Sequence, residues 1–431
     1  MGRIIYNLLL PLGFVFFIPE LVLKYRGRGG WKSTFRERFA CYGDRKAELA
    51  SFRGAIWVHA VSVGETVVAL SMIRRYLQRF PERRFILSTT TTTGQDVARA
   101  NCPERTAVIF CPIDFPWMIR KALRLLRPVA LVIFETEIWP NLISIAAGKK
   151  IPVLLVNARM SDHSAKGYRR LGKVFFDPLL RKFSRILTQT ESDTARFLSV
   201  SPRARVVTAG NMKFDQKLPE LPTDNVLDRY FGAESGRLVL FGASTHPGEE
   251  ALLADCFNVL RREFPGLKLV LVPRHAERGG DVADILRERG ISFARRSLAA
   301  ESVRVDALLA DTTGEMPLLM RGADVVVMGK SFAGHDEGHN LIEPALLGKP
   351  IVTGPVLRNF RYIFSVLENQ NALMPAADGE LTEVLRRLLA SESLRTTLGR
   401  KAFEVIDANR GAVDRTIDEL ERLLPPAGSA E

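Results

Sequence analysis

The residues with the clearest chemical potential in this sequence are carboxylates that directly follow strand-like segments. Glu65 lies in the stretch HAVSVGE, one tight turn after the segment AIWVHAV, while Glu135 and Glu137 end the apolar segment VALVIF. A carboxylate within hydrogen-bond reach of a hydroxyl group can accept its proton and make the oxygen a nucleophile. These three residues are therefore the candidates for general-base chemistry.

Each of these carboxylates also has a structural alternative. Ser62 and Glu65 have the spacing of a capping box, in which Ser62 accepts from the backbone N–H of Glu65 and the Glu65 side chain reaches back. Taken alone, this stretch favours the cap. If Glu65 is a base, we expect its side chain to turn away from the Ser62 backbone and into a cleft. Two-residue alternation predicts that Glu135 and Glu137 point the same way, so they need a nearby cation or hydrogen-bond donors.

Small and basic residues follow strand-like segments in the second half of the chain. The stretch GASTHPGEEALL (242–253) predicts a strand, a turn and a helix that begins near Pro247. Ser244 and Thr245 are candidates either to cap this helix or to contribute to an anion site at its start. The stretch lacks the P-loop pattern.

A basic turn follows the next strand-like segment in LVPRHAERGG (271–280), with Arg274, His275 and Arg278. The guanidinium group suits bidentate contact with a phosphate, and the alternative is a solvated basic turn.

The stretch GKSFAGHDEGHNLIEPALLGKP (329–350) concentrates the most candidate residues. A helix that starts near Asn340 would carry Glu343 on its first turn, where the carboxylate can accept from a ribose hydroxyl. Three glycines allow the preceding loop to approach a ligand closely, namely Gly329, Gly334 and Gly338. A metal site is the alternative, with His335, Asp336 and His339, but no fourth ligand with suitable spacing is present, so we expect no metal.

Strand-like and helix-like segments alternate along the chain, which is typical of parallel, doubly wound sheets. Helical patterns such as 64–80 and 115–127 separate the strands. The strand-like segments are 55–61, 83–90, 106–113, 128–136, 151–158 and 184–190 in the first half, and 237–244, 267–274, 306–312, 323–330 and 349–354 in the second. Ligands of such sheets bind beyond the carboxyl ends of the strands, so the candidate groups are expected to surround one cavity.

A chain of 431 residues is too long for one ordinary core and predicts two domains of roughly 150–200 residues each. The Pro-rich and polar stretch after residue 216 indicates a linker. We expect a membrane anchor over 1–30, a first domain over 31–216, a linker over 217–236, a second domain over 237–400, and a C-terminal helix and tail over 401–431.

The N-terminal segment from Ile5 to Leu23 is almost entirely apolar and has about the length of a membrane helix. A signal peptide and a buried core helix are the alternatives, but no small-residue cleavage site follows. Basic residues follow the segment and only Arg3 precedes it, so the positive-inside rule places the body of the protein in the cytoplasm. Membrane anchoring is therefore the preferred interpretation.

The formal net charge is +13, which suits a phosphorylated substrate, an anionic membrane surface or nucleic acid. The basic residues are not interleaved with aromatic residues and no nucleic-acid motif is present, so we expect no nucleic-acid partner. The four cysteines show neither CxxC spacing nor a paired framework, which indicates a reducing compartment.

Eight motifs in a consistent order give the chain a strong resemblance to the 3-deoxy-D-manno-octulosonic acid (Kdo) transferases of lipopolysaccharide synthesis. The resemblance extends from the N-terminal segment to about residue 370. The motifs are HAVSVGE (59–65), FETEIWPN (134–141), NARMSDHS (157–164), GNMKFD (210–215), ASTHPGEE (243–250), PRHAER (273–278), DTTGEM (311–316) and GHNLIEPALLGKPIVTGP (338–355).

The resemblance implies an α/β protein of the GT-B fold, with two Rossmann-like domains facing a cleft. The first would take the acceptor and the second CMP-Kdo. The reaction implied is inverting transfer of Kdo to the lipid A precursor at the cytoplasmic side of the inner membrane, with no cofactor. Glu65 matches the family's general base, and its second important acid falls on Glu135 or Glu137. The donor contacts implied are Asn211, Lys213, Ser244, Thr245, Arg274, His275, Gly314, Glu315, Asn340 and Glu343.

Departures from the family pattern concern the donor loop. The sequence has ADTTGEM (310–316) where GDTMGEL is usual. The Gly-rich loop that usually precedes GHN is altered, with Lys330 and the segment FAGHDEGHN, and Glu337 stands where a small residue is more usual. These changes predict a donor loop of altered shape or charge. Another nucleotide-sugar enzyme of the GT-B fold, a glycosyltransferase or an epimerase, is the alternative function. A non-enzymatic membrane-binding or nucleic-acid-binding protein is the third.

Overall fold

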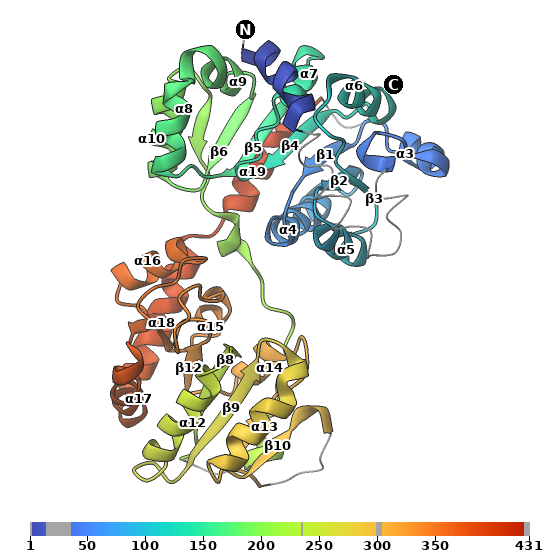
Figure 1. Cartoon of the computed structure of the whole chain (residues 1–431). Coiled ribbons are helices and arrows are strands. Elements are labelled where there is room, and N and C mark those ends of the chain that lie inside the picture. Colours follow the sequence, from blue (N-terminus) through green and yellow to red (C-terminus); the bar gives the residue numbers. More distant parts are fainter. Residues whose placement is uncertain (1, 14–35, 234–235, 299–303, 426–431) are drawn as a thin grey trace. The chain divides into compact units, whose positions relative to one another are not determined.

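The computed structural model describes residues 2–13, 36–233, 236–298 and 304–425, which form two compact units (Figure 1). Unit 1 comprises Met1–Asp215 and Arg410–Glu431, and unit 2 comprises Gln216–Asn409. Each unit has one parallel sheet covered by helices on both faces, as the alternating pattern predicts.

The sheet of unit 1 contains seven strands in the described residues, in the order β3-β2-β1-β4-β5-β6-β7. All neighbouring strands are parallel; for example, Ile56 of β1 pairs with both Phe85 of β2 and Ala130 of β4. The strands are β1 (Ile56–His59), β2 (Phe85–Thr89), β3 (Thr106–Phe110), β4 (Ala130–Phe134), β5 (Val153–Ala158), β6 (Arg185–Thr188) and β7 (Val206–Thr208).

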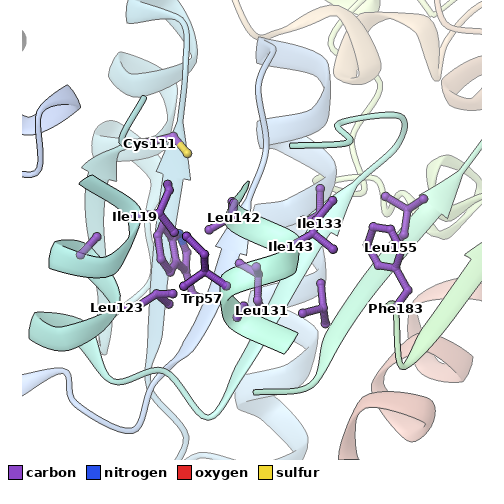
Figure 2. Close-up of a cluster of buried hydrophobic side chains, with 14 of the residues drawn as sticks. Trp57, Cys111, Ile119, Leu123, Leu131, Ile133, Leu142, Ile143, Leu155 and Phe183 are labelled. Atoms are coloured by element: carbon purple, nitrogen blue, oxygen red, sulfur yellow. The ribbon is translucent and has the colours of Figure 1, made fainter. Parts of the chain in front are cut away.

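Helices follow nearly every strand of unit 1. They are α3 (Lys46–Ser51), α4 (Val63–Arg79), α5 (Thr92–Asn101), α6 (Pro116–Leu126), α7 (Pro140–Gly148), α8 (Asp162–Arg170), α9 (Asp177–Leu180), α10 (Glu191–Val200) and α19 (Ala412–Glu421). Because alternate residues of a strand face opposite sides, the sheet supports two cores. Figure 2 shows one of them, where Trp57 and Leu131 of the sheet pack with Ile119 and Leu123 of α6 and Leu142 of α7.

The C-terminal helix α19 belongs to unit 1, although the sequence suggested a separate segment over 401–431. Val413 and Ile417 of α19 lie in the second core, against the sheet face that α4 also covers. Asp215 accepts hydrogen bonds from the backbone N–H groups of Gly411 (2.5 Å) and Val413 (2.7 Å) at the start of α19. The described structure therefore divides the expected C-terminal segment between the two units, with α18 (Glu392–Ala408) remaining in unit 2.

The sheet of unit 2 contains seven parallel strands in the described residues, in the order β10-β11-β9-β8-β12-β13-β14. The strands are β8 (Leu238–Thr245), β9 (Leu267–Pro273), β10 (Phe293–Arg295), β11 (Ala307–Leu309), β12 (Val325–Met328), β13 (Ile351–Thr353) and β14 (Met374–Pro375). The remaining helices are α11 (Asp228–Phe231), α12 (Glu249–Leu260), α13 (Gly279–Glu288), α14 (Met316–Met320), α15 (Ile342–Leu346), α16 (Arg361–Asn369) and α17 (Leu381–Ala390).

The sequence pattern missed three strands, β7, β10 and β14. Each lies at the edge of its sheet and is at most three residues long, so none contains a sustained apolar run. All eleven strand-like segments read from the sequence contain a strand of the structure.

In each sheet the chain adds the next strands on one side of its first strand and then crosses to the other side. In unit 1 the point at which the direction changes lies between β1 and β4, and in unit 2 between β8 and β12. Ligands of doubly wound sheets bind at the carboxyl ends of the strands at such points. Glu65 follows β1, Glu135 follows β4, Thr245 ends β8 and Lys330 follows β12, so the candidate motifs lie at these two points.

The N-terminal residues 2–13 form a helix that contacts unit 1 through its polar side chains. Arg3 Nε donates to Asn141 Oδ1 (2.8 Å), and the Tyr6 hydroxyl donates to Asp114 Oδ2 (3.0 Å). Asp114 in turn accepts from the backbone N–H groups of Asn141 and Leu142 at the start of α7. Burial is the main cause that raises the pKa of Asp114, to about 6.

Most of the large apolar side chains of this helix are exposed, whereas Leu10 packs against the first core. Those exposed are Ile4, Ile5, Leu8, Leu9 and Leu12. Within the residues that the structure describes, none of the helices is long and apolar enough to cross a membrane. The remainder of the expected anchor, from residue 14 to residue 30, lies outside the described residues.

Candidate active site

Three carboxylates gather at the carboxyl ends of β1 and β4 in unit 1. Glu65 and Glu135 are buried, with 9% and 6% of their surface exposed, and Glu137 is partly buried. The negative charges interact, because Glu135 raises the pKa of Glu65 and both Glu65 and Glu135 raise the pKa of Glu137. The structure thus brings together the three residues predicted to do acid–base chemistry.

Glu65 lies on the first turn of α4 and takes part in a cap. Its backbone N–H donates to Ser62 Oγ (3.3 Å), while its carboxylate accepts from the Val61 N–H (2.9 Å) and the Ser62 hydroxyl (2.9 Å). The expectation that the side chain turns away from the helix start is wrong in this structure. Burial is the largest cause that raises the pKa of Glu65, and the hydrogen bonds from Val61 and Ser62 oppose it.

Glu135 is the first residue after β4 and adopts a left-handed backbone conformation, with φ of 53°. This conformation is uncommon for a residue with a side chain and is often found at functional sites. The carboxylate contacts two cations, Arg159 Nη2 at 3.0 Å and Lys213 Nζ at 3.8 Å. The expectation that these acidic residues need a nearby cation is confirmed for Glu135.

Glu137 is held by a neighbouring aromatic residue. Trp139 Nε1 donates to Glu137 Oε2 (3.1 Å), and the Trp139 ring packs edge-on against the buried His59, with ring centres 6.1 Å apart. Burial, then Glu65, raises the pKa of Glu137. Because β4 ends at Phe134, Glu135 and Glu137 lie beyond the strand, so strand alternation does not determine where their side chains point.

A cavity of about 120 Å³ adjoins this cluster in unit 1. Polar groups and apolar surface both line it, from Thr136, Ile138, Arg159, Met160, Ser164, Tyr168 and Phe197. Such a mixed lining suits a sugar, which presents hydroxyl groups and apolar C–H faces. Arg159 links the cavity to Glu135, so a bound group there would lie next to the carboxylates.

In unit 2 the turn after β8 differs from the sequence prediction. Helix α12 begins at Glu249 with Gly248 at its N-cap, so Ser244 and Thr245 do not cap it. The Ser244 hydroxyl contacts Met316 Sδ, and the buried Thr245 hydroxyl donates to Glu250 Oε1 (2.9 Å).

Glu249 organises the loop that follows β12. Its buried carboxylate accepts from four backbone N–H groups, those of His246, Lys330, Ser331 and Phe332, at 2.8 to 2.9 Å. The neighbouring Gly329 lets the chain pass close to β8, because a Cβ there would lie 2.3 Å from the Ser244 carbonyl oxygen. In a phosphate-binding loop, backbone N–H groups such as these are free to bind the phosphate. Here the Glu249 carboxylate accepts from them instead.

The remaining donor candidates of unit 2 occupy neighbouring loops. Asn340 Nδ2 donates to Gln216 Oε1 (2.8 Å), and Gln216 Nε2 donates to Glu343 Oε1 (3.1 Å), so one glutamine joins the two candidates. Burial raises the pKa of Glu343 above its usual value, although the hydrogen bonds with Gln216 and Asn340 and the charge of Arg274 oppose the shift. Arg274 and His275 are exposed, as the alternative of a solvated basic turn predicts.

The other four donor candidates lie outside these loops. Glu315 is ion-paired with Arg296 (2.7 Å) and accepts from the Thr312 hydroxyl (2.5 Å), while Gly314 is exposed with φ of 88°. Asn211 and Lys213 belong to unit 1, where Asn211 Oδ1 accepts from the Lys213 N–H (3.0 Å) and Lys213 faces Glu135.

The residues that sequence reasoning missed are the partners of the predicted ones, chiefly Arg159, Glu249 and Glu250. Arg159 directly follows β5 in the motif NARMSDHS, a position that could have marked it. Glu250 is fully buried and forms a bidentate ion pair with Arg278. In the described part of the chain no group of three histidines, cysteines or acids could hold a metal ion.

Comparison with known proteins places this site in a family. The family model for 3-deoxy-D-manno-octulosonic-acid transferase (kdotransferase) matches residues 33–216. The 3-deoxy-D-manno-octulosonic acid transferase of Bordetella pertussis is 33% identical, with 98% of this chain and 100% of the relative covered. That of Haemophilus influenzae is 31% identical, with 91% and 92% covered.

A solved structure with the same architecture is the UDP-GlcNAc 2-epimerase from Neisseria meningitidis bound to UDP-GlcNAc. The TM-score is 0.54 at 13% identity, with 85% of this chain and 100% of that chain covered, which supports the fold alone. The two units have the GT-B fold. Because the curated relatives match nearly the whole chain, the chain belongs to the 3-deoxy-D-manno-octulosonic acid (Kdo) transferases and is a glycosyltransferase.

Proposed function

We propose that this protein transfers Kdo from CMP-Kdo to the phosphorylated, acylated disaccharide precursor of lipid A, with inversion at the anomeric carbon. The observation that supports this proposal is the cluster of Glu65, Glu135 and Glu137 at the carboxyl ends of β1 and β4. The chain's relatives are Kdo transferases, which makes this cluster the candidate catalytic site. A sugar hydroxyl needs a base to become a nucleophile, and a buried carboxylate of raised pKa supplies one. We propose Glu65 for this role: when the acceptor binds, its carboxylate would exchange the hydrogen bonds from the Val61 N–H and the Ser62 hydroxyl for one from the acceptor hydroxyl.

The reaction proceeds in one displacement. The acceptor hydroxyl gives its proton to Glu65 as its oxygen forms a bond to the anomeric carbon of Kdo, and the bond from that carbon to the CMP phosphate oxygen breaks. A single displacement inverts the anomeric centre. The CMP leaving group needs electrostatic stabilisation more than it needs an acid, and Arg274 and Lys213 are the cations proposed to supply it.

We further propose that the protein acts at the cytoplasmic face of the inner membrane. The helix over residues 2–13 supports this, because its polar residues contact unit 1 and five large apolar side chains remain exposed. In the sequence the apolar run continues to Leu23 and is followed by basic residues that suit anionic headgroups. An acylated, phosphorylated acceptor would be met at the same surface.

Replacing Leu8 and Leu12 together by Asn is expected to weaken binding to vesicles of anionic phospholipid by at least tenfold. These side chains are 70% and 60% exposed, so the change removes apolar surface that would enter the bilayer, at roughly 25 cal/mol per Å². Co-sedimentation measures the bound fraction. Val259→Asn, which alters an exposed apolar residue of α12, is the control. Binding equal to that of the native protein would contradict the membrane role of this helix.

The transfer rate is expected to fall as the pH is lowered, and the midpoint of this fall should lie at a pH above the usual pKa of a glutamate. The rate falls in this direction because the base accepts a proton only when its carboxylate is ionised. Burial and neighbouring charges raise the pKa of Glu65 and of Glu137, so a higher pH is needed to ionise them than for an exposed carboxylate. Initial rates across pH 4 to 8, measured with saturating substrates, test this, and a flat acid limb down to pH 4 would contradict it.

The proposed function is tested by incubating the protein with CMP-Kdo and tetraacylated lipid A precursor and analysing the lipid by mass spectrometry. The expected product carries Kdo. Parallel reactions with UDP-sugars test the alternative, another nucleotide-sugar enzyme of the same fold. A product from a UDP-sugar, with none from CMP-Kdo, would contradict the proposal.

A further inference from the structure

Four of the six histidines of the chain converge on one patch of unit 2. His246 follows β8, His275 follows β9, and His335 and His339 lie in the loop after β12. These strands are neighbours in the sheet, so their carboxyl ends meet at one edge. The ring centre of His246 lies 5.1 Å from that of His339, 5.5 Å from that of His335 and 6.0 Å from that of His275.

The contact between His246 and His339 restricts their protonation. Their Nε2 atoms are 3.0 Å apart, so one nitrogen donates and the other accepts. Both atoms therefore cannot carry a proton at once in this arrangement. The same contact engages the Nε2 lone pair of the accepting ring.

The surroundings of this pair are predominantly cationic. Lys330, His335, His275 and Arg278 face His246, and His246, Arg274 and Lys330 face His339. The nearby acids are already engaged: Glu249 accepts four backbone N–H groups, Glu250 holds Arg278, Glu337 faces Lys330 at 3.6 Å, and Glu277 faces His275 at 3.6 Å.

The histidine pair and the cationic residues around it favour an anionic ligand that is bound by side chains. Glu249 engages the backbone N–H groups of residues 330–332, so the loop lacks the free N–H groups of a phosphate-binding loop. Arg278 is held by Glu250, but the pairs of Lys330 and His275 with partly exposed glutamates are loose, at 3.6 Å, and an anion could displace them. An anion oxygen can also accept from the Nε2 atoms of both His246 and His339, whereas only one of these atoms can donate to the other.

We propose that His246 and His339, flanked by His275 and His335, form an anion subsite that takes up a proton when the donor binds. This inference rests on the proposed function, in which the donor is CMP-Kdo. The group bound is a phosphate or carboxylate of that donor, and the experiment below distinguishes the two.

Electrostatics determines whether protons are taken up or released when the anion binds. Burial first, and then the neighbouring cations, lower the pKa of both His246 and His339 to about 4, so both rings are neutral at pH 7. An anion cancels the repulsion and raises these pKa values, so protons move onto the protein as it binds. Affinity is therefore highest at low pH and falls as the pH rises through the pKa of the occupied site, by up to about tenfold per pH unit for one proton.

The test is calorimetric titration of the full-length protein at pH 7 in two buffers of different ionisation enthalpy, with CMP, cytidine and free Kdo as separate ligands. The difference in measured heat gives the number of protons taken up. We expect uptake with CMP if the phosphate is the group bound, with Kdo if the carboxylate is, and none with cytidine. A phosphate monoester itself titrates near pH 6, so variants isolate the histidine contribution.

His246→Gln and His339→Gln should lose most of the proton uptake and flatten the pH dependence of binding, whereas His163→Gln, an exposed histidine of unit 1, should keep both. Binding of CMP or Kdo with the same proton uptake in all variants, or with none in the native protein, would overturn this inference and leave the proposed function intact. Failure of both ligands to bind would overturn it together with the donor assignment, and the transfer assay would then decide the proposed function separately.

Discussion

Replacing Glu65 by Gln is expected to lower the rate of Kdo transfer by about 10² to 10⁴, the usual contribution of a general base. The amide cannot take the proton of the acceptor hydroxyl. It can keep the local structure, because its oxygen can accept from the Val61 N–H and its NH₂ group can donate to the Ser62 hydroxyl, the two groups that the carboxylate now contacts.

This variant separates the two roles of Glu65. If the residue is only a cap, Glu65→Gln should transfer Kdo at the native rate and unfold at nearly the native temperature. If it is the base, the rate falls while the melting temperature changes little. Glu104→Gln, an exposed glutamate of the same unit, is the matched control for the loss of one charge.

The same assay identifies the second essential acid. Glu135 contacts Arg159 and Lys213, whereas Glu137 accepts from Trp139. Glu135→Gln and Glu137→Gln therefore perturb different neighbours while each removes one charge. The variant that loses transfer at saturating substrate, with its fold retained, marks the acid that acts with Glu65.

Replacing Glu249 by Gln is expected to destabilise unit 2 by roughly 2 to 5 kcal/mol, because a buried carboxylate that accepts from four backbone N–H groups becomes an amide with one acceptor oxygen. The NH₂ group of the glutamine would face N–H donors. Residues 330–332 would then lose the carboxylate that now holds their backbone.

Chemical denaturation measures this loss of stability, and hydrogen exchange at residues 330–332 reports whether it arises at the loop. The control is Glu288→Gln, which removes a charge from an exposed glutamate at the end of α13. Equal unfolding free energies for Glu249→Gln and Glu288→Gln would show that the four hydrogen bonds contribute little. A loss of donor binding without a loss of stability would instead assign Glu249 a direct role in binding.

The sequence by itself determined the architecture and the position of the candidate groups along the chain. Buried parallel strands are continuous apolar runs, so β1 and β4 could be read directly, and with them the carboxylates that follow. Short edge strands such as β7 and β14 have no such run and could not be read. The family motifs identified the chemistry because their residues lie beyond strand ends, where doubly wound sheets bind ligands.

Only the tertiary structure decided which groups face one another. Arg159, Lys213 and Glu135 are separated along the chain, as are Glu249 and the loop at 330–332, so no local pattern relates them. The return of α19 to unit 1 likewise depends on its apolar residues packing beside α4 against the same face of the sheet. Ion pairs, buried hydrogen bonds and helix packing depend on distances between atoms remote in sequence, and the sequence pattern records only the periodicity of each element.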